Sequence, residues 1–283
     1  MIHTMEVRLA RYAGSCYGVQ RALDLANDLL EEGRSASTLG PLIHNPIVVE
    51  KLAESGIAPA DDVGSIETET VIIRSHGITP EISDELEEHG FDIIDATCPH
   101  VARAQMGAAN LARNGCHVLV VGEEGHPEVE SLVAYARRHG AEVDVVSKPE
   151  HIPDGLEDPV GVVVQTTQTR SMLDGVLGRL SEMGIEPEVK NTICSATQDR
   201  QKAAAELAQE VDAMVVIGGK NSSNTTRLAE ICSRYCPTTF HIESADELVP
   251  EALDGCSVIG VTAGASTPED QIEIVMRRLE SMA

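Results

Sequence analysis

Three cysteines recur along the chain, and each is followed 28 positions later by a polar residue that can donate hydrogen bonds. Thiolates are ligands for iron and zinc, while histidine and serine side chains can bind anions. A fixed spacing of both residue types indicates an internal repeat, which could build a metal site and an anion site from three parts. The pairs are Cys16 with His44, Cys98 with His126, and Cys194 with Ser222.

A second polar cluster closes each repeat, directly after a run rich in β-branched residues. The clusters are at residues 74–77, 165–168 and 262–266, and the runs before them are at 71–73, 162–164 and 258–261. The repeating unit is therefore cysteine, helix, strand, polar turn, helix, strand and polar turn. We predict an α/β fold of three similar modules in a pseudo-threefold arrangement, with one cysteine from each module at a common centre.

The length of the chain suits three modules of fewer than a hundred residues each. The predicted modules are residues 1–97, 98–193 and 194–283, with an N-terminal strand at about residues 1–15 that is expected to pack with the third module. Of the 283 residues, 42% are apolar but only 2% are aromatic, and none is tryptophan. The predicted cores therefore consist of valine, isoleucine, leucine and alanine.

The charge of the chain restricts its partners and its location. A formal net charge of −25 argues against nucleic acid and against an anionic membrane surface. Residues 1–12 lack the basic start and apolar stretch of a signal peptide, and no run of about 18 apolar residues occurs. We therefore expect a cytoplasmic protein, in which seven cysteines suggest metal or redox chemistry rather than disulfides.

Each repeat cysteine is expected at the amino terminus of a helix. Cys16 precedes apolar residues at helical spacing from Val19 onward, Cys98 is followed by Pro99, and Cys194 is followed by residue types that cap helices. At this position the main-chain amides and the positive end of the helix dipole stabilise a thiolate. The same three cysteines are therefore suited to bind a metal.

The four other cysteines are interpreted as small buried hydrophobic residues. Two of them are four positions apart on an expected helix and could share a metal, although an apolar stripe with Leu228 and Ile231 is the simpler interpretation. The four are Cys116, Cys232, Cys236 and Cys256.

The wide separation of the repeat cysteines bears on the kind of metal centre. A structural zinc site has four protein ligands, at least two of them at a short local spacing, whereas these cysteines lie 82 and 96 positions apart. An iron-sulfur cube held by three cysteines leaves one iron open to a substrate. We therefore predict a central iron-sulfur cluster between the three modules.

Six segments together resemble the 4-hydroxy-3-methylbut-2-enyl diphosphate reductases, which end the methylerythritol phosphate route to isoprenoids. They include Gly-Ser-Cys-Tyr-Gly-Val around Cys16, His-Pro-Glu at 126–128 and Lys-Asn-Ser-Ser-Asn at 220–224. The resemblance extends from about Arg8 to Leu279, and the segments occur in the order of the family. They are residues 14–19, 95–99, 125–129, 165–167, 219–224 and 262–266.

The resemblance implies a [4Fe-4S] enzyme that takes two electrons and two protons. It would expel the allylic hydroxyl as water and yield isopentenyl and dimethylallyl diphosphates, with ferredoxin or flavodoxin as a typical reductant. By the same resemblance, Glu128 matches the proton donor and Thr166 the hydroxyl that helps to position Glu128 and the substrate alcohol. The cluster ligands match Cys16, Cys98 and Cys194, and the diphosphate-binding positions match His44, His76, His126, Ser222, Ser223, Asn224 and Ser266.

The matched residues also make chemical sense by themselves. A diphosphate needs several donors, and side chains at helix starts can provide them in an acidic chain that has no phosphate loop. Ser222 and Asn224 could equally be plain helix caps, and Glu128 could be a solvated carboxylate that only interacts with the helix dipole. A proton donor, by contrast, must keep its proton near neutral pH, which requires burial.

Two departures from the family pattern and two other functions remain at this point. Ser15 stands where the family usually has phenylalanine, which could alter packing over the cluster, and the longer C-terminal tail of some members is absent after Ala283, which touches no matched residue. Quinolinate synthase, another three-module enzyme, also holds a cluster by three cysteines. A non-catalytic iron-sulfur redox sensor would need neither the phosphate donors nor an acid at Glu128.

Overall fold

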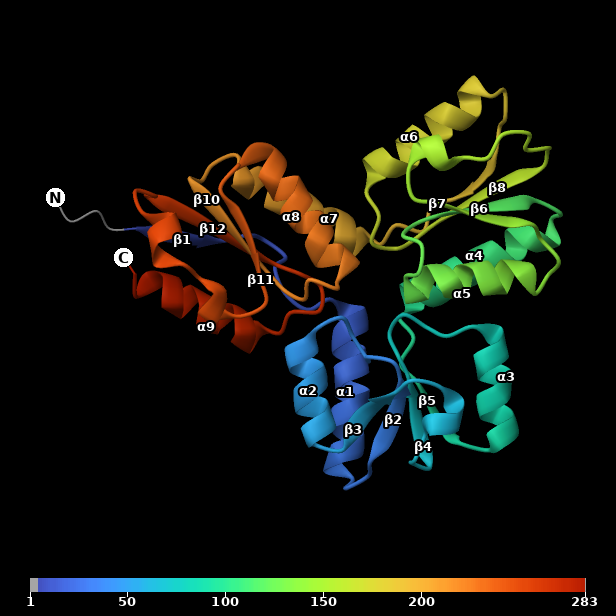
Figure 1. Cartoon of the computed structure of the whole chain (residues 1–283), viewed down its shortest axis with the longest axis horizontal. Coiled ribbons are helices and arrows are strands. Elements are labelled where there is room, and N and C mark those ends of the chain that lie inside the picture. The colour runs from blue at the N-terminus through green and yellow to red at the C-terminus, as the bar shows by residue number, and fades with distance from the viewer. Residues whose placement is uncertain (1–4, 283) are drawn as a thin grey trace. The chain divides into compact units, whose positions relative to one another are not determined.

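The computed structural model describes residues 5–282 and contains three parallel sheets of four strands, each flanked by helices (Figure 1). Sheet A has the order β1 (Glu6–Leu9), β12 (Val258–Ala263), β10 (Ala213–Ile217) and β11 (Thr239–Ile242). Sheet B has the order β3 (Ile57–Ala60), β2 (Ala36–Leu39), β4 (Thr70–Ile73) and β5 (Asp92–Asp95). Sheet C has the order β7 (Val143–Val146), β6 (His117–Val121), β8 (Val160–Val164) and β9 (Glu188–Lys190).

The helices alternate with the strands, as parallel pairing requires. They are α1 (Tyr17–Glu31), α2 (Pro46–Glu54), α3 (Pro80–His89), α4 (Pro99–Arg113), α5 (Pro127–Arg137), α6 (Arg170–Glu182), α7 (Ser195–Ala208), α8 (Ser223–Tyr235) and α9 (Glu269–Glu280). Short 3₁₀ helices lie at Val63–Ser65, Pro149–His151, Ala245–Glu247 and Pro250–Leu253. The predicted α/β class with three similar modules is confirmed.

The three sheets have the same strand order once β1 is aligned with β5 and β9. In sheets B and C the last strand of the module pairs beside β4 and β8, whereas in sheet A the corresponding position is taken by β1, from the other end of the chain. Strand β1 runs parallel to β12 with Glu6 opposite Val258. The first strand of the chain therefore completes the sheet of the last repeat. Residues 1–4 of the expected N-terminal strand lie outside the described residues, and the module boundaries stay a prediction.

The described chain forms two compact units. One contains the residues up to Val19, His44–Ile47 and the chain from Ser195 onward, and it holds sheet A. The other contains Gln20–Ile43 and Val48–Cys194, and it holds sheets B and C. An ion pair of 2.8 Å between Arg138, which caps the end of α5, and Asp84 of α3 joins the two modules of this second unit.

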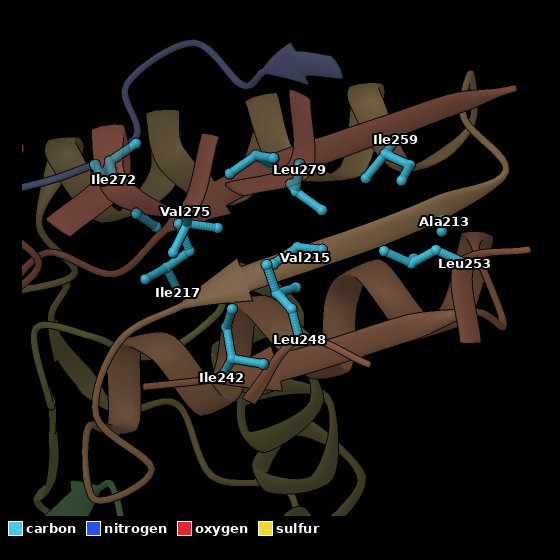
Figure 2. Close-up of a cluster of buried hydrophobic side chains, with 12 residues drawn as sticks. Ala213, Val215, Ile217, Ile242, Leu248, Leu253, Ile259, Ile272, Val275 and Leu279 are labelled. Carbon is cyan, nitrogen blue, oxygen red and sulfur yellow. The ribbon is translucent and has the colours of Figure 1, made fainter. Parts of the chain in front are cut away.

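Alternating residues of the central strands supply two cores in the modules of sheets A and C. In β6, Val118 and Val120 pack with α4 and α5, while Leu119 and Val121 pack with α6. Figure 2 shows one core of sheet A, in which side chains of β10, β11 and β12 gather with Val275 and other residues of α9. The largest fully buried side chains are leucine, isoleucine and methionine, so the predicted non-aromatic cores are confirmed.

Helices begin just beyond the carboxyl ends of the strands, where parallel α/β folds bind ligands. Thr79 and Thr169 cap α3 and α6 by accepting hydrogen bonds from main-chain N–H groups. Proline is the first residue of α2, α3, α4 and α5, which explains why these helices start where the sequence predicts. Helix α3 ends after His89, where Gly90 adopts the left-handed conformation that terminates helices.

Candidate active site

The three repeat cysteines occupy equivalent positions in the three modules. Cys16, Cys98 and Cys194 each directly precede a helix, namely α1, α4 and α7, and each is partly exposed. Their main-chain N–H groups donate to carbonyl oxygens of Ala265, Ser75 and Thr166, each at a distance of 3.0 Å. These three carbonyls belong to the three polar turns that close the repeats. Each cysteine is therefore held at its helix start by the turn of a neighbouring repeat.

The chemistry of the cysteines fits a group that is bound by three thiolates. The side chain of Cys98 makes no capping hydrogen bond although the residue is the N-cap of α4. Cys116, Cys232 and Cys236 are buried as expected, whereas Cys256 is only partly buried. Burial raises the pKa of Cys232 to about 12. Cys232 and Cys236 lie in the apolar core that includes Leu228, so the expected structural interpretation of this pair is confirmed.

Ser15, the departure from the family pattern, has a local partner. Its hydroxyl donates to the carbonyl of Thr267 at 3.2 Å. Gly14 beside it has a φ of +99°, and a Cβ there would lie 3.0 Å from the side chain of Ile272. The loop before Cys16 therefore lies against the third polar turn, with a hydrogen bond where an aromatic ring would pack.

Glu128 is a buried acidic residue of the second unit. It lies in the first turn of α5, its side chain is 1% exposed, and both of its carboxyl oxygens are bonded to Thr166. The main-chain N–H of Thr166 donates at 2.7 Å and the hydroxyl at 2.8 Å. Glu128 and Thr166 are thus brought together from α5 and the second polar turn.

Burial raises the pKa of Glu128 to about 7, because the charged form loses its hydration. The two hydrogen bonds from Thr166 oppose this shift, since they stabilise the carboxylate. At neutral pH the carboxyl group is therefore close to half protonated. This environment contradicts a solvated dipole partner at position 128 and suits an acid, whereas Glu124 and Glu130 are exposed.

His126 and His76 lie beside each other near this acid. His126 is the N-cap of α5, and its Nδ1 accepts a hydrogen bond from the main-chain N–H of Glu128 at 3.1 Å. Burial and, to a smaller extent, the Arg74 guanidinium lower the pKa of His126 to about 4. The ring is therefore neutral with its proton on Nε2, which makes Nε2 a donor. The His76 ring meets it edge to face with 5.8 Å between centroids.

The polar residues at the start of α8 belong to the first unit. Ser222 is the N-cap of α8, and its hydroxyl accepts from the main-chain N–H of Thr225 at 3.3 Å. Ser223 and Asn224 follow in the first turn, and all three side chains are buried. Neither amide atom of Asn224 has a hydrogen-bond partner among the described residues. Ser222 is thus a cap, as the simpler interpretation expected, but a buried unpartnered amide points to a ligand.

His44 and Ser266 are also brought together in the first unit. The Ser266 hydroxyl donates to the carbonyl of His44 at 2.8 Å, and the Asn45 amide donates back to the carbonyl of Ser266 at 2.8 Å. A Cβ at Gly219 would lie 2.8 Å from the His44 carbonyl, so only glycine allows this approach. The predicted donors His44, Ser222, Ser223, Asn224 and Ser266 therefore all lie at helix starts and turns beside sheet A.

Several polar residues near the site were missed by the sequence reasoning. Arg74 is a cation that depresses the pKa of His126, and its Nε donates to the carbonyl of Gly77 at 3.3 Å. Gln165 is fully buried, and its side-chain oxygen accepts from the main-chain N–H of Glu123 at 3.0 Å. Only the position of Gln165 inside the second polar turn could have indicated it. Lys220 pairs with Glu247, as expected.

The raised pKa of Glu128 predicts a pH-dependent stability of the metal-free protein. Below about pH 4.5 the carboxyl group is protonated in both the folded and the unfolded protein, so folding does not remove a charge from water. Between pH 4.5 and about 7 the unfolded chain holds fewer protons, so the free energy of unfolding falls as pH rises, and it levels off above 7. The loss amounts to at most about 3 kcal/mol.

Urea unfolding at pH 5 and pH 8 measures this effect. The decrease in stability between the two pH values should be smaller in Glu128→Gln than in the wild type, because the amide does not ionise. The exposed Glu124→Gln provides the control and should behave as the wild type. An equal decrease in all three proteins would mean that Glu128 does not titrate in this range.

A buried acid with a pKa of about 7 lies next to the neutral imidazole of His126 and is suited to donating a proton. Together with the three-module α/β fold, this site defines an enzyme that uses general acid catalysis. The chain belongs to the LytB family, because the family's sequence model, described as LytB protein, matches residues 7–280.

Relatives and solved structures agree with this assignment over nearly the whole chain. The 4-hydroxy-3-methylbut-2-enyl diphosphate reductase of Trichlorobacter lovleyi is 44% identical over 279 residues, covering 98% of this chain and 99% of the relative. That of Aquifex aeolicus is 43% identical over 280 residues, covering 98% and 97%.

Two solved structures resemble the structure of this chain. A structure of (E)-4-hydroxy-3-methyl-but-2-enyl diphosphate reductase, the terminal enzyme of the non-mevalonate pathway, aligns with a TM-score of 0.71 at 43% identity and covers 98% of this chain and 99% of that one. The E-1-hydroxy-2-methyl-but-2-enyl-4-diphosphate reductase of Plasmodium falciparum aligns with a TM-score of 0.88 at 24% identity, covering 97% and 87%. The second likeness supports the fold alone.

Proposed function

We propose that this chain is a 4-hydroxy-3-methylbut-2-enyl diphosphate reductase, an oxidoreductase that completes the non-mevalonate route to isoprenoids. It would convert its substrate to isopentenyl and dimethylallyl diphosphates by uptake of two electrons and two protons with loss of water. The observation that carries this proposal is Glu128, a buried acid with a pKa of about 7 at the position of the family's proton donor. The names of the relatives favour this reductase over quinolinate synthase and over a redox sensor.

The proposed cofactor is a [4Fe-4S] cluster ligated by Cys16, Cys98 and Cys194. Its support is the donor set itself, three partly exposed thiols at helix starts, where thiolates are stabilised. When bound, such a cluster supplies electrons to the substrate and an open iron that can bind its oxygen. The remaining chemistry falls to the side chains of the chain.

Glu128 is proposed to deliver a proton, and Thr166 to hold the acid in place. In its neutral form the carboxyl can donate its proton, and the donor hydroxyl and N–H of Thr166 fix its two oxygens. A bound diphosphate would favour the neutral acid further, because its negative charge opposes ionisation. His126, kept neutral with Nε2–H as donor, can bind an anionic oxygen without competing for the acid's proton.

The diphosphate is proposed to bind to neutral donors rather than to lysines. The candidate donors are His44, His76, His126, Ser222, Ser223, Asn224 and Ser266, several of them at helix starts where anions are stabilised. Asn224 supports this proposal most directly, since an amide buried without a partner gains hydrogen bonds when an anion binds.

The reductant and location are further parts of the proposal. We infer an external one-electron carrier such as ferredoxin or flavodoxin, a cytoplasmic location, and no role for nucleic acid or membrane, in agreement with the charge of −25. Within residues 5–282 no helix has the length and apolar character needed to cross a bilayer.

Ligand affinity separates this function from the alternatives. The iron-loaded protein, supplied with a chemical one-electron reductant under anaerobic conditions, should consume the allylic diphosphate and bind the corresponding free alcohol far more weakly. Equal affinity for alcohol and diphosphate, or no turnover of the diphosphate, would contradict the proposal.

Asn224→Ala should weaken diphosphate binding about tenfold to a hundredfold, the usual loss for a hydrogen bond to a charged group. The matched control is Asn110→Ala, which removes an exposed amide from α4 and should bind as the wild type. Calorimetric titration with the diphosphate measures both. Unchanged affinity in Asn224→Ala would exclude Asn224 from the anion site.

A further inference from the structure

Arg200 is a buried cation that contacts the loop leading into Cys16. It lies in α7, six positions after Cys194, and it is only 4% exposed. One guanidinium nitrogen donates to the carbonyl of Gly14 at 2.7 Å, and another donates to Ala196 of its own helix at 3.1 Å. The guanidinium thus links the helix that follows one repeat cysteine to the loop that precedes another.

Arg21 forms the same kind of link for Cys98. It lies in α1, five positions after Cys16, and donates to the carbonyls of Asp95 at 3.0 Å and Thr97 at 3.4 Å. Asp95 is the last residue of β5 and Thr97 directly precedes Cys98, so both carbonyls lie just before that cysteine. Two of the three cysteine loops are therefore held by an arginine from the helix that follows a different repeat cysteine.

The third loop, before Cys194, is fixed in another way. The Thr192 hydroxyl donates to the carbonyl of Val164 and accepts from the N–H of the same residue at 3.1 Å. Arg103, which follows Cys98 by five positions as Arg21 follows Cys16, is exposed and forms no side-chain hydrogen bond or ion pair with the described residues. Arg103 can therefore serve as an internal control for Arg200 and Arg21, which do hold a loop.

We propose that Arg200 and Arg21 are positioning residues for the cluster ligands Cys16 and Cys98. The inference rests on the proposed function, because it assigns these cysteines to the cluster. Carbonyl oxygens held by a guanidinium fork fix the backbone before each thiol, so the thiols are pre-organised for ligation. The nearby positive charge also favours the more negative, reduced state of a cluster, so it raises the reduction potential.

Hydrogen exchange of the metal-free protein tests the positioning role without any cluster. In Arg200→Met, the amides of residues 13–17 should exchange about tenfold to a hundredfold faster, because a hydrogen bond to a charged donor no longer resists local opening. Residues 95–98 should be unaffected. Arg21→Met should give the reverse pattern, with faster amide exchange at residues 95–98 and an unchanged exchange rate at residues 13–17.

The reduction potential of the loaded protein tests the charge. Redox titration followed by electron paramagnetic resonance should give a more negative midpoint potential for Arg200→Met than for the wild type. Arg200→Lys keeps the charge but lacks the planar fork, so it should restore the potential while exchange at 13–17 stays partly elevated. A purely structural role of Arg200 would not produce this separation.

Two controls distinguish the proposal from general destabilisation. Arg103→Met removes an exposed charge at the helix position equivalent to that of Arg21 without touching a loop, and it should leave exchange at 13–17 and at 95–98 unchanged. Leu228→Ala weakens a core of the same unit away from the Cys16 loop. Local exchange equal to the wild type in Arg200→Met, an unchanged potential, or the same local pattern in Leu228→Ala would overturn the proposal. A wild-type protein that binds no cluster would instead overturn the proposed function, and the exchange result would still decide the positioning of Cys16.

Discussion

Cys98→Ser is expected to leave the protein without an iron-sulfur cluster and to abolish turnover. The hydroxyl of serine is a poor ligand for iron at neutral pH, whereas cysteine thiolates are the usual ligands of iron-sulfur clusters. The main-chain N–H of Cys98 donates a hydrogen bond to the carbonyl of Ser75, and the side chain takes no part in it. The start of α4 should therefore keep its structure in the variant. The same result is expected for Cys16→Ser and Cys194→Ser, because each occupies the equivalent position in its module.

Iron and sulfide analysis of anaerobically prepared protein, together with turnover, measures this result. Cys116→Ala is the matched control, because Cys116 is buried in the core of sheet C and is no ligand. It should keep the brown colour, the iron and the sulfide, with some loss of stability. Full iron and sulfide in Cys98→Ser would disprove its role, and stoichiometric zinc without sulfide in the wild type would disprove the cluster.

The fold could be predicted largely because it repeats. Proline and capping residues mark helix starts locally, and β-branched runs mark the central strands, so one module could be compared with the next. The sequence predicts that the N-terminal strand packs with the third module, but it does not predict which strand β1 pairs with or in which register. The pairing of β1 with β12 joins residues about 250 positions apart, and nothing local in Glu6–Leu9 specifies that partner.

The site could be predicted in its residue types but not in its electrostatics. The resemblance to the family singled out Glu128, yet whether it is solvated or buried depends on contacts with Thr166, 38 positions later. The same holds for Arg74 and Arg200. Each is an ordinary basic residue in the sequence, and its effect arises from a tertiary neighbour, His126 in the first case and Gly14 in the second.

Glu128→Gln is expected to reduce turnover by about a hundredfold to ten-thousandfold, the usual contribution of positioned proton transfer. Glutamine keeps the shape of the side chain but has no proton to give to a substrate as an acid. Its oxygen can still accept from the main-chain N–H of Thr166, and its NH₂ group can donate to the Thr166 hydroxyl, which reverses that second hydrogen bond. The variant should keep its iron and bind the diphosphate with near wild-type affinity. Steady-state kinetics and calorimetric binding under anaerobic conditions separate these two quantities.

Thr166→Val serves as a milder comparison with Glu128→Gln. It removes one hydrogen bond to the carboxylate, so the pKa of Glu128 should rise further, while the main-chain bond and the proton source remain. Its turnover should therefore fall less. The exposed Glu124→Gln, four positions before the acid, should turn over at the wild-type rate.

The pH profile tests whether Glu128 acts as an acid rather than as a structural group. In the wild type, kcat/KM should fall above about pH 7, because the free enzyme loses the proton of Glu128 there. Glu128→Gln should lack this alkaline limb, since its residual activity does not depend on that proton. If Glu128→Gln instead kept wild-type turnover with its cluster intact, Glu128 would be a buried helix-start residue and the proton would come from another group. His126 would be the first to test, although its pKa of about 4 makes the neutral ring a weak acid at physiological pH.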